Sequence, residues 1–353
     1  MSAASDSEHA ETIRNIVREA FAGGDQPEPA VARVTEDGSW VGVELGGDML
    51  PRSGLKTAYE AIARGLPDVG VEVRQAGRIF RGGDGWGEGR YVVAVAGGKG
   101  GVGKSTTAVN LALTLAAMGE RVGLLDCDIN APDVPHMLGM QVTRGTAQAT
   151  LRPMNERVVS PARRRRPHER YGVEMMSVGM EIPERLPPRV TSRLQVSTLL
   201  RNLVFEVNWS ARILILDAPP GTGEELQTIA GELPLSGALL VTTPQDLAQM
   251  DAERTLTLLA EHHVPVAGMV KNMASLTCPH CSRDIDMYAS SARLKDAGVP
   301  IIGAIPFDVV LSSAADRGVP LVLSDPRGPI AYEFARIGAY VRRWISERAN
   351  VTA

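Results

Sequence analysis

Residues 97–106 read GGKGGVGKST. An apolar run, Tyr91–Ala96, comes before them, and good helix formers follow from Ser105 to Met118. The pattern G-x-x-x-x-G-K-[ST] between a strand and a helix is typical of a phosphate-binding loop, and a ligand-free glycine turn is much rarer there. Glycines let backbone N–H groups surround phosphate oxygens, and the positive end of the following helix adds attraction. The stretch therefore predicts a P-loop nucleotide-binding domain.

One continuous segment is expected to supply most contacts to ATP. It comprises Gly98, Lys99, Gly100, Gly101, Val102, Gly103, Lys104, Ser105 and Thr106. Lys104 is expected to reach the β- and γ-phosphates and Ser105 to give a hydroxyl to Mg²⁺. Lys99 makes this the two-lysine form of the motif. On the motif alone, Lys99 is either solvated or directed to a phosphate held by a facing subunit.

Composition limits the possible partners of the chain. Its 353 residues suffice for one large α/β domain and one small domain. A net charge of −4 argues against nucleic-acid binding through bulk charge, and Arg163–Arg166 is expected to be a solvated loop. No apolar run is long enough to span a membrane, and the N-terminus has no signal-like stretch. We expect a cytoplasmic protein with neither nucleic-acid nor membrane partners.

A glycine-rich stretch, RGGDGWGEG at residues 81–89, has the composition of a linker. Residues 1–80 before it are expected to form a small α+β domain. That domain would contain helices near Ala10–Ala20 and Gly54–Arg64 and strands near Trp40–Leu45 and Val69–Val73. Residues 90–353 after it are expected to form the ATPase domain.

Apolar runs alternate with helical segments through residues 90–353, which predicts an α/β fold of the P-loop, doubly wound kind. Because most of these runs are continuously apolar, the sheet is expected to be mostly parallel and covered on both faces. The expected strands are Tyr91–Ala96, Arg121–Leu125, Arg212–Leu216, Ala238–Thr242, Pro265–Val270 and Pro300–Ile305. A terminal amphipathic helix, Pro329–Glu347, is expected to pack on the core.

Polar residues follow several of these strands, where ligands gather in open α/β sheets. Asp128 is expected to act catalytically, by orienting a water toward the γ-phosphorus or holding a Mg²⁺-bound water; a helix N-cap is the alternative. Asp217 ends an apolar strand and is expected to bind Mg²⁺ through water. Asn272 carries a donor and an acceptor and can match an adenine edge. Asp133 is a weaker candidate for a role like that of Asp128.

Cysteines suggest a metal centre. Cys278-Pro-His-Cys281 is a C-x-x-C pair, which is half of a tetrahedral thiolate site. No second C-x-x-C occurs in the chain, so a four-thiolate site requires two copies. A redox dithiol and a structural zinc shared across a dimer are alternatives. His280 is expected to be a neighbour of the ligands, and Cys127 a small packed residue.

Taken together, the motifs resemble the Mrp/ApbC-type iron–sulfur cluster carrier ATPases, a branch of the two-lysine P-loop superfamily that includes MinD and ParA. The resemblance extends from about Tyr91 to the C-terminus. The segments that carry it are GGKGGVGKST, LLDCDINAPDVPHMLGM, LDAPPGTGEE, VTTPQDLAQMDA, GMVKNMASLTCPHC and PIIGAIPFD.

That resemblance implies a homodimer that binds ATP and Mg²⁺ and holds a [4Fe–4S] cluster between the Cys278 and Cys281 pairs of both copies. The cluster would pass to apo-proteins, with slow ATP hydrolysis serving as a switch. It makes Lys99 the signature lysine, Asp128 the switch carboxylate and Asp217 the Walker B carboxylate. The alternatives are a ParA/MinD-type positioning ATPase, a zinc-stapled dimeric ATPase and an electron donor to a reductase.

Overall fold

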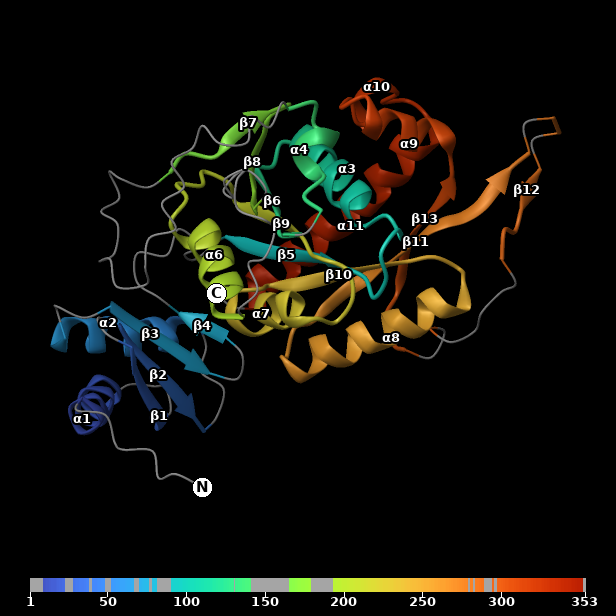
Figure 1. Cartoon of the computed structure of the whole chain (residues 1–353). Coiled ribbons are helices and arrows are strands. Elements are labelled where there is room, and N and C mark those ends of the chain that lie inside the picture. Colours follow the sequence, from blue (N-terminus) through green and yellow to red (C-terminus); the bar gives the residue numbers. More distant parts are fainter. Residues whose placement is uncertain are drawn as a thin grey trace.

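In this computed structural model the chain forms two β-sheets, and each sheet has a separate hydrophobic core (Figure 1). The smaller sheet comes from the N-terminal part of the chain and the larger sheet from the remainder. The structure describes residues 9–22, 28–37, 40–47, 52–66, 70–75, 78–80, 90–129, 131–140, 165–178, 193–278, 280–281, 283–288, 294 and 297–351.

The smaller sheet has four strands in the order β1–β2–β3–β4, of which only β2 and β3 pair in parallel. Its strands are β1 (Ala30–Asp37), β2 (Trp40–Gly46), β3 (Gly70–Gln75) and β4 (Arg78–Phe80). Two helices pack on it, α1 (Ala10–Phe21) and α2 (Arg52–Gly65). α1 buries Ile13 and Val17 because apolar residues recur along one of its faces.

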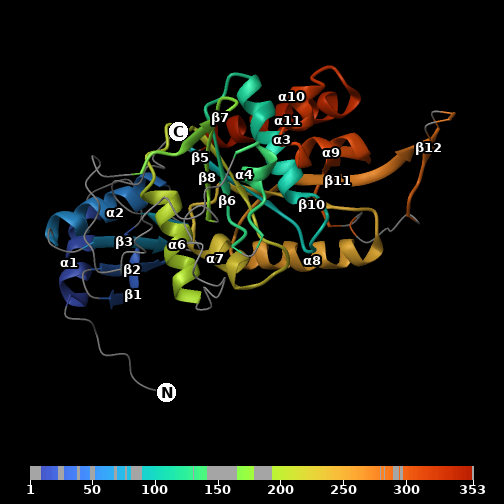
Figure 2. The same ribbon diagram turned by 45° about the horizontal axis from the view of Figure 1, so that its top comes forward.

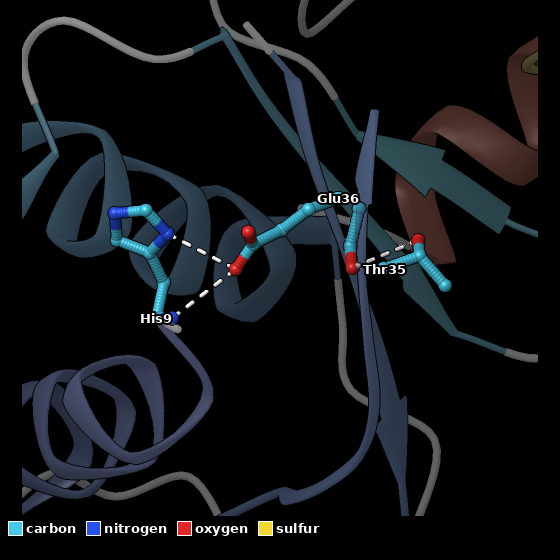
Figure 3. Close-up of polar contacts among 4 residues, drawn as sticks. His9, Thr35 and Glu36 are labelled. Atoms are coloured by element: carbon cyan, nitrogen blue, oxygen red, sulfur yellow. Dashed lines mark hydrogen bonds and ion pairs between the residues drawn. The ribbon is translucent and has the colours of Figure 1, made fainter. Parts of the chain in front are cut away.

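Polar contacts tie the start of α1 to the outer strand of this sheet (Figure 3). The backbone N–H of His9 donates to Oε1 of Glu36 at 3.1 Å, and Nδ1 of the same histidine lies 3.0 Å from that oxygen. On the neighbouring residue of β1, the hydroxyl of Thr35 donates to the carbonyl of Gly42 at 3.3 Å. The His9–Glu36 contacts fix the start of α1 against β1, and the Thr35–Gly42 bond joins β1 to β2, so we assign all of them a structural role.

The larger sheet has nine strands in the order β12–β11–β10–β5–β9–β6–β8–β7, with β13 also paired to β11. All pairs are parallel except β11–β12 and β7–β8 at the two ends. Its strands are β5 (Tyr91–Ala96), β6 (Val122–Asp126), β7 (His168–Arg170), β8 (Val173–Ser177), β9 (Ile213–Asp217), β10 (Gly237–Thr242), β11 (Val266–Thr277), β12 (Asp284–Ile285) and β13 (Ile301–Phe307).

Helices cover both faces of the larger sheet (Figures 1 and 2). One face carries α3 (Lys104–Ala117), α4 (Val134–Met137), α9 (Val309–Asp316), α10 (Leu321–Ser324) and α11 (Pro329–Val351). The other face carries α6 (Arg193–Phe205), α7 (Glu224–Glu232) and α8 (Asp246–Glu261). Burial on both faces explains why the central strands are continuously apolar. The doubly wound, mostly parallel α/β fold is confirmed, with a small α+β unit before it.

Predicted strands agree with the observed ones to within one or two residues, except that β11 continues to Thr277. The strands β1, β4, β7, β8 and β12 were not predicted. The predicted linker at residues 81–89 lies outside the described residues, so the domain boundary stays a prediction. Arg163 and Arg164 of the predicted solvated loop also lie outside the described residues, and Arg165 and Arg166 are exposed. Among the described helices, none has the length and apolar character required to cross a bilayer.

Candidate functional site

The glycine-rich loop connects the end of β5 to the start of α3. Gly101 and Gly103 have φ angles of 77° and 92°, in the left-handed region that favours glycine. Gly103 occupies the N-cap position of α3, so the loop delivers its N–H groups to the positive end of that helix. This arrangement is the anion-binding geometry that the sequence predicts for residues 97–106.

Gly98 holds the loop directly against α8. A Cβ atom at this position would lie 2.0 Å from the backbone oxygen of Asp251 in the first half of α8. Helix backbone cannot yield as a flexible side-chain tip can. Glycine at this position therefore allows the loop and α8 to approach each other.

We expect Gly98→Ala to lower the free energy of unfolding by about 1–3 kcal/mol, because the loop and α8 must separate to admit a methyl group. Chemical denaturation measures this change. Gly100→Ala is the matched control, since a Cβ there would meet only Pro220 Cβ at 4.0 Å. Equal stability of the two variants would contradict the close packing at Gly98.

Lys104 opens α3 and is buried, with 7% of its surface exposed. Its Nζ donates to the backbone oxygen of Lys99 at 3.4 Å. Burial lowers the pKa of Lys104, and the nearby carboxylates of Asp217 and Asp128 oppose that shift. The ammonium group is thus held inside the loop by a single backbone acceptor and two acidic neighbours, where a phosphate group would meet it.

Asp217 ends β9 beside this lysine and is 1% exposed. Burial raises the pKa of Asp217 to about 7, while the hydroxyl of Ser105 and the charge of Lys104 act in the opposite direction. Its Oδ1 atom has no hydrogen-bond partner among the described residues. A buried carboxylate oxygen without a partner, next to the Ser105 hydroxyl, fits a hydrated Mg²⁺ ion, which prefers oxygen donors.

Asp126 is a second buried carboxylate that sequence analysis did not select. It ends β6 and pairs in register with Asp217 on the adjacent strand. Oδ2 of Asp126 accepts from the hydroxyl of Ser177 at 3.0 Å and from the N–H of Val134 at 3.3 Å, and its Oδ1 accepts from the N–H of Asp128 at 3.2 Å. Burial and the neighbouring Asp217 raise the pKa of Asp126 well above its ordinary value. Its position at a strand end was the signal available in the sequence.

The raised pKa of Asp217 predicts how stability changes with pH in the absence of nucleotide and Mg²⁺. Folded Asp217 keeps its proton up to pH about 7, whereas an unfolded chain releases it near 3.8. The folded state therefore binds more protons between these values, and the free energy of unfolding falls as pH rises from about 4 to about 7. We expect a loss on the order of a few kcal/mol. Chemical denaturation across this range should show a shallower slope for Asp217→Asn, and an unchanged slope would refute the assignment.

Asp128 lies two residues beyond β6, and its Oδ1 accepts from the N–H of Ala131 at 3.0 Å. Its charge acts on both Lys104 and Asp217, which places the carboxylate near the phosphate pocket. Asp133 is exposed, precedes α4 without a side-chain capping bond, and also raises the pKa of Asp217. The loop after β6 thus brings both predicted carboxylates to the same edge of the sheet.

Lys99 on the loop and Asn272 on β11 each form a hydrogen bond that links the loop to another part of the domain. Nζ of Lys99 donates to Oε1 of Gln245, just before α8, at 3.5 Å. The buried Asn272 on β11 donates through Nδ2 to the carbonyl of Val102 at 2.9 Å. The Asn272 amide therefore braces the phosphate loop, and its predicted contact with adenine stays a prediction.

Cys278 and Cys281 lie beyond the end of β11, where β11 and β12 form a two-stranded ribbon that projects from the molecule (Figures 1 and 2). The N–H of Cys278 donates to the carbonyl of Arg283 at 2.8 Å, and the hydroxyl of Thr277 donates to Asp284 at 2.8 Å. Cys278 is half-buried and Cys281 exposed. N–H groups of His280 and Cys281 lower the pKa of the Cys278 thiol, which favours the thiolate that binds metals.

Within the described residues, no three His, Cys, Asp or Glu side chains are grouped to hold a metal ion. The two ribbon thiols provide two of the four donors of a tetrahedral thiolate site. Cys127, by contrast, is fully buried in the core, as predicted, and burial raises the pKa of its thiol.

A glycine loop on a helix N-terminus, a buried lysine and carboxylates at adjacent strand ends define a P-loop nucleotide-binding ATPase. Its described residues also present a pair of accessible thiols. The chain belongs to the family described as NUBPL iron-transfer P-loop NTPase, whose family model matches residues 88–342. The resemblance drawn from the motifs is thereby confirmed.

Relatives with known names agree with this family. The mouse protein named iron-sulfur cluster transfer protein NUBPL is 37% identical over 260 residues, covering 72% of this chain and 77% of the mouse protein. An iron-sulfur cluster carrier protein from Methanocaldococcus jannaschii is 34% identical over 254 residues, covering 70% of this chain and 82% of its own length. These relatives support the carrier prediction over the ParA/MinD-type alternative.

Solved structures agree with the fold. A nucleotide-binding protein from Archaeoglobus fulgidus in complex with ADP superposes with a TM-score of 0.52 at 27% identity, covering 69% of this chain and 91% of that one. The septum site-determining protein MinD of Pyrococcus horikoshii, complexed with Mg-ADP, gives a TM-score of 0.56 at 19% identity, covering 75% and 99%. The second likeness shows the fold alone.

Proposed function

We propose that this protein is an ATP-dependent iron–sulfur cluster carrier that works as a homodimer. Two subunits place their Cys278 and Cys281 thiols around one [4Fe–4S] cluster, and the cluster passes from there to apo-protein clients. Hydrolysis of ATP is slow and acts as a switch between holding and releasing the cluster.

The observation that carries this proposal is the position of the two thiols. They lie beyond the end of a ribbon outside both cores of the larger sheet, with Cys281 exposed and the Cys278 thiol biased toward the thiolate. A pair of thiolates fills half of a four-thiolate set, so a second copy of the chain supplies the rest. Accessible thiolates also suit cargo that must be released to an acceptor.

On the nucleotide side, the residues fit ATP with Mg²⁺. The backbone of residues 97–106 and the ammonium of Lys104 would hold the phosphates. Ser105 and the unpartnered Oδ1 of Asp217 would hold the hydrated Mg²⁺, which neutralises phosphate charge when bound. Asp128 would orient the attacking water. Lys99, now bonded to Gln245 of its own chain, would turn toward a phosphate of the facing subunit.

We also propose residues 81–89 as the boundary between a small N-terminal domain (1–80) and the ATPase domain (90–353). The proposed setting is the cytoplasm, where a reducing environment keeps both cluster thiols free of disulfides.

Anaerobic reconstitution with iron and sulfide tests the function. We expect the visible absorbance of an iron–sulfur cluster, and native mass spectrometry should find one four-iron cluster for every two chains. Transfer is followed by activation of an apo-protein that requires such a cluster. A cluster bound by a single chain would refute the shared site, and tight zinc with no iron uptake would support the zinc-stapled alternative.

A further inference from the structure

β11 connects the two halves of the site. Near its middle, Nδ2 of Asn272 donates to the carbonyl of Val102 at 2.9 Å. A Cβ atom on Gly103 would lie 2.1 Å from the same amide nitrogen, so the side chain is pressed against the loop immediately before Lys104. Six residues further along, the chain reaches Cys278. One strand therefore contacts the phosphate loop and leads to the thiols.

Between Asn272 and the cysteines, the pairing of β11 with β13 is irregular. Asn272 pairs with Ile305 of β13, and the next pair joins Leu276 to Phe307, so residues 273–275 face only Pro306. Proline has no N–H group and cannot donate to the ladder, which explains why regular pairing fails here. Bulges of this kind redirect a strand, and here the redirected part is the ribbon that holds the cysteines.

Met273 is the strained residue of this bulge. Its φ angle is 52°, in the left-handed region that a side chain with a Cβ atom rarely adopts. Strained residues of this kind occur where the surrounding structure holds them, often at switch regions. The strain lies directly beside Asn272, between the loop contact and the ribbon.

One contact inside the phosphate loop involves the lysine that a phosphate would bind. In this structure Nζ of Lys104 donates to the carbonyl of Lys99 within the loop. A bound phosphate would compete for that donor, which would release the loop backbone from the contact. Val102 and Gly103 lie between these two lysines, so a shift there reaches Asn272 directly.

We propose that Asn272 and Met273 are positioning residues that transmit the state of the phosphate loop along β11 to the two thiols. Nucleotide binding shifts Asn272, and this shift changes the bend of β11 at Met273. The ribbon then moves, which changes the accessibility of the Cys278 and Cys281 thiols. This inference rests on the proposed function, because it names the link between the ATP switch and the cluster ligands.

Thiol alkylation of the metal-free protein tests the link without any cluster. The sequence has three cysteines and Cys127 is fully buried, so labelling of the folded protein reports on Cys278 and Cys281. We expect ATP with Mg²⁺ to change the labelling rate by about fivefold or more relative to nucleotide-free protein. Met273→Val should bring this ratio close to one, because a β-branched residue disfavours the left-handed conformation.

Met273→Asn is the matched control and should keep the ratio, since asparagine tolerates that conformation. ATP titration and thermal unfolding establish that each variant binds nucleotide and folds. If Met273→Val does not fold, Pro306→Ala replaces it, with Pro300→Ala as its control, and the ratio should fall only in Pro306→Ala. The inference is overturned if nucleotide leaves the wild-type labelling rate unchanged. It is also overturned if Met273→Val keeps the wild-type ratio of labelling rates, which is the result expected if dimer contact alone shields the thiols.

Failure of cluster reconstitution, measured separately, would instead overturn the proposed function.

Discussion

Replacing both ribbon cysteines, Cys278→Ser with Cys281→Ser, should abolish the visible absorbance that iron and sulfide produce in the wild-type protein. Serine keeps the size of the side chain but removes the thiolate, which is the ligand that an iron–sulfur cluster requires. The effect should be complete, because no other thiol among the described residues is accessible. Iron content per dimer, measured after anaerobic gel filtration, should fall to background.

ATP affinity of this double variant should be unchanged, since the ribbon lies beyond the bulge and outside the phosphate pocket. Cys127→Ala is the matched control: it removes the third cysteine, which is buried in the core, and should leave the cluster in place. Retention of iron and absorbance by the double variant would show that other residues hold the cluster.

Removal of the buried lysine, Lys104→Ala, should weaken ATP binding by about 100-fold or more, because a charge-assisted contact to phosphate is lost within a buried pocket. The same change removes the positive charge beside Asp217 and Asp128, so these carboxylates would repel the negatively charged phosphates of ATP more strongly. Isothermal titration with ATP and Mg²⁺ measures the loss.

Arg343→Ala serves as the comparison, since it removes a positive charge from the exposed surface of α11 and should bind ATP normally. Reconstitution of Lys104→Ala with iron and sulfide should still succeed, because the thiols are intact. Near-normal ATP affinity in Lys104→Ala would remove this lysine from the phosphate site.

The sequence predicted the parts of the fold and site that depend on local signals. The glycine loop was recognisable because strand, glycines and helix are contiguous, and the buried central strands were recognisable because they are continuously apolar. Asp128 and Asp217 were predicted because each directly follows or ends such a strand. The short strand β8, Val173–Ser177, was missed because it contains a glutamate and gains its place by pairing with β6 and β7.

Non-local contacts account for the other omissions. Asp126 lies next to Cys127 and Asp128 in the sequence, but its importance arises from Asp217 on the neighbouring strand and from Ser177 on β8. The bulge of β11 and the pairing that continues beyond it depend on β13, which contains Pro306 and comes much later in the sequence, so no pattern within β11 reveals them. Both features require knowledge of which strands are neighbours.

The ribbon formed by β11 and β12 extends away from both packed layers of helices (Figure 2). An acceptor protein would therefore need to approach only this ribbon, and neither helix layer would have to open for the cluster to leave. The same accessibility exposes the cargo to oxygen and chelators. Metal would accordingly be lost in air while the rest of the molecule stayed folded.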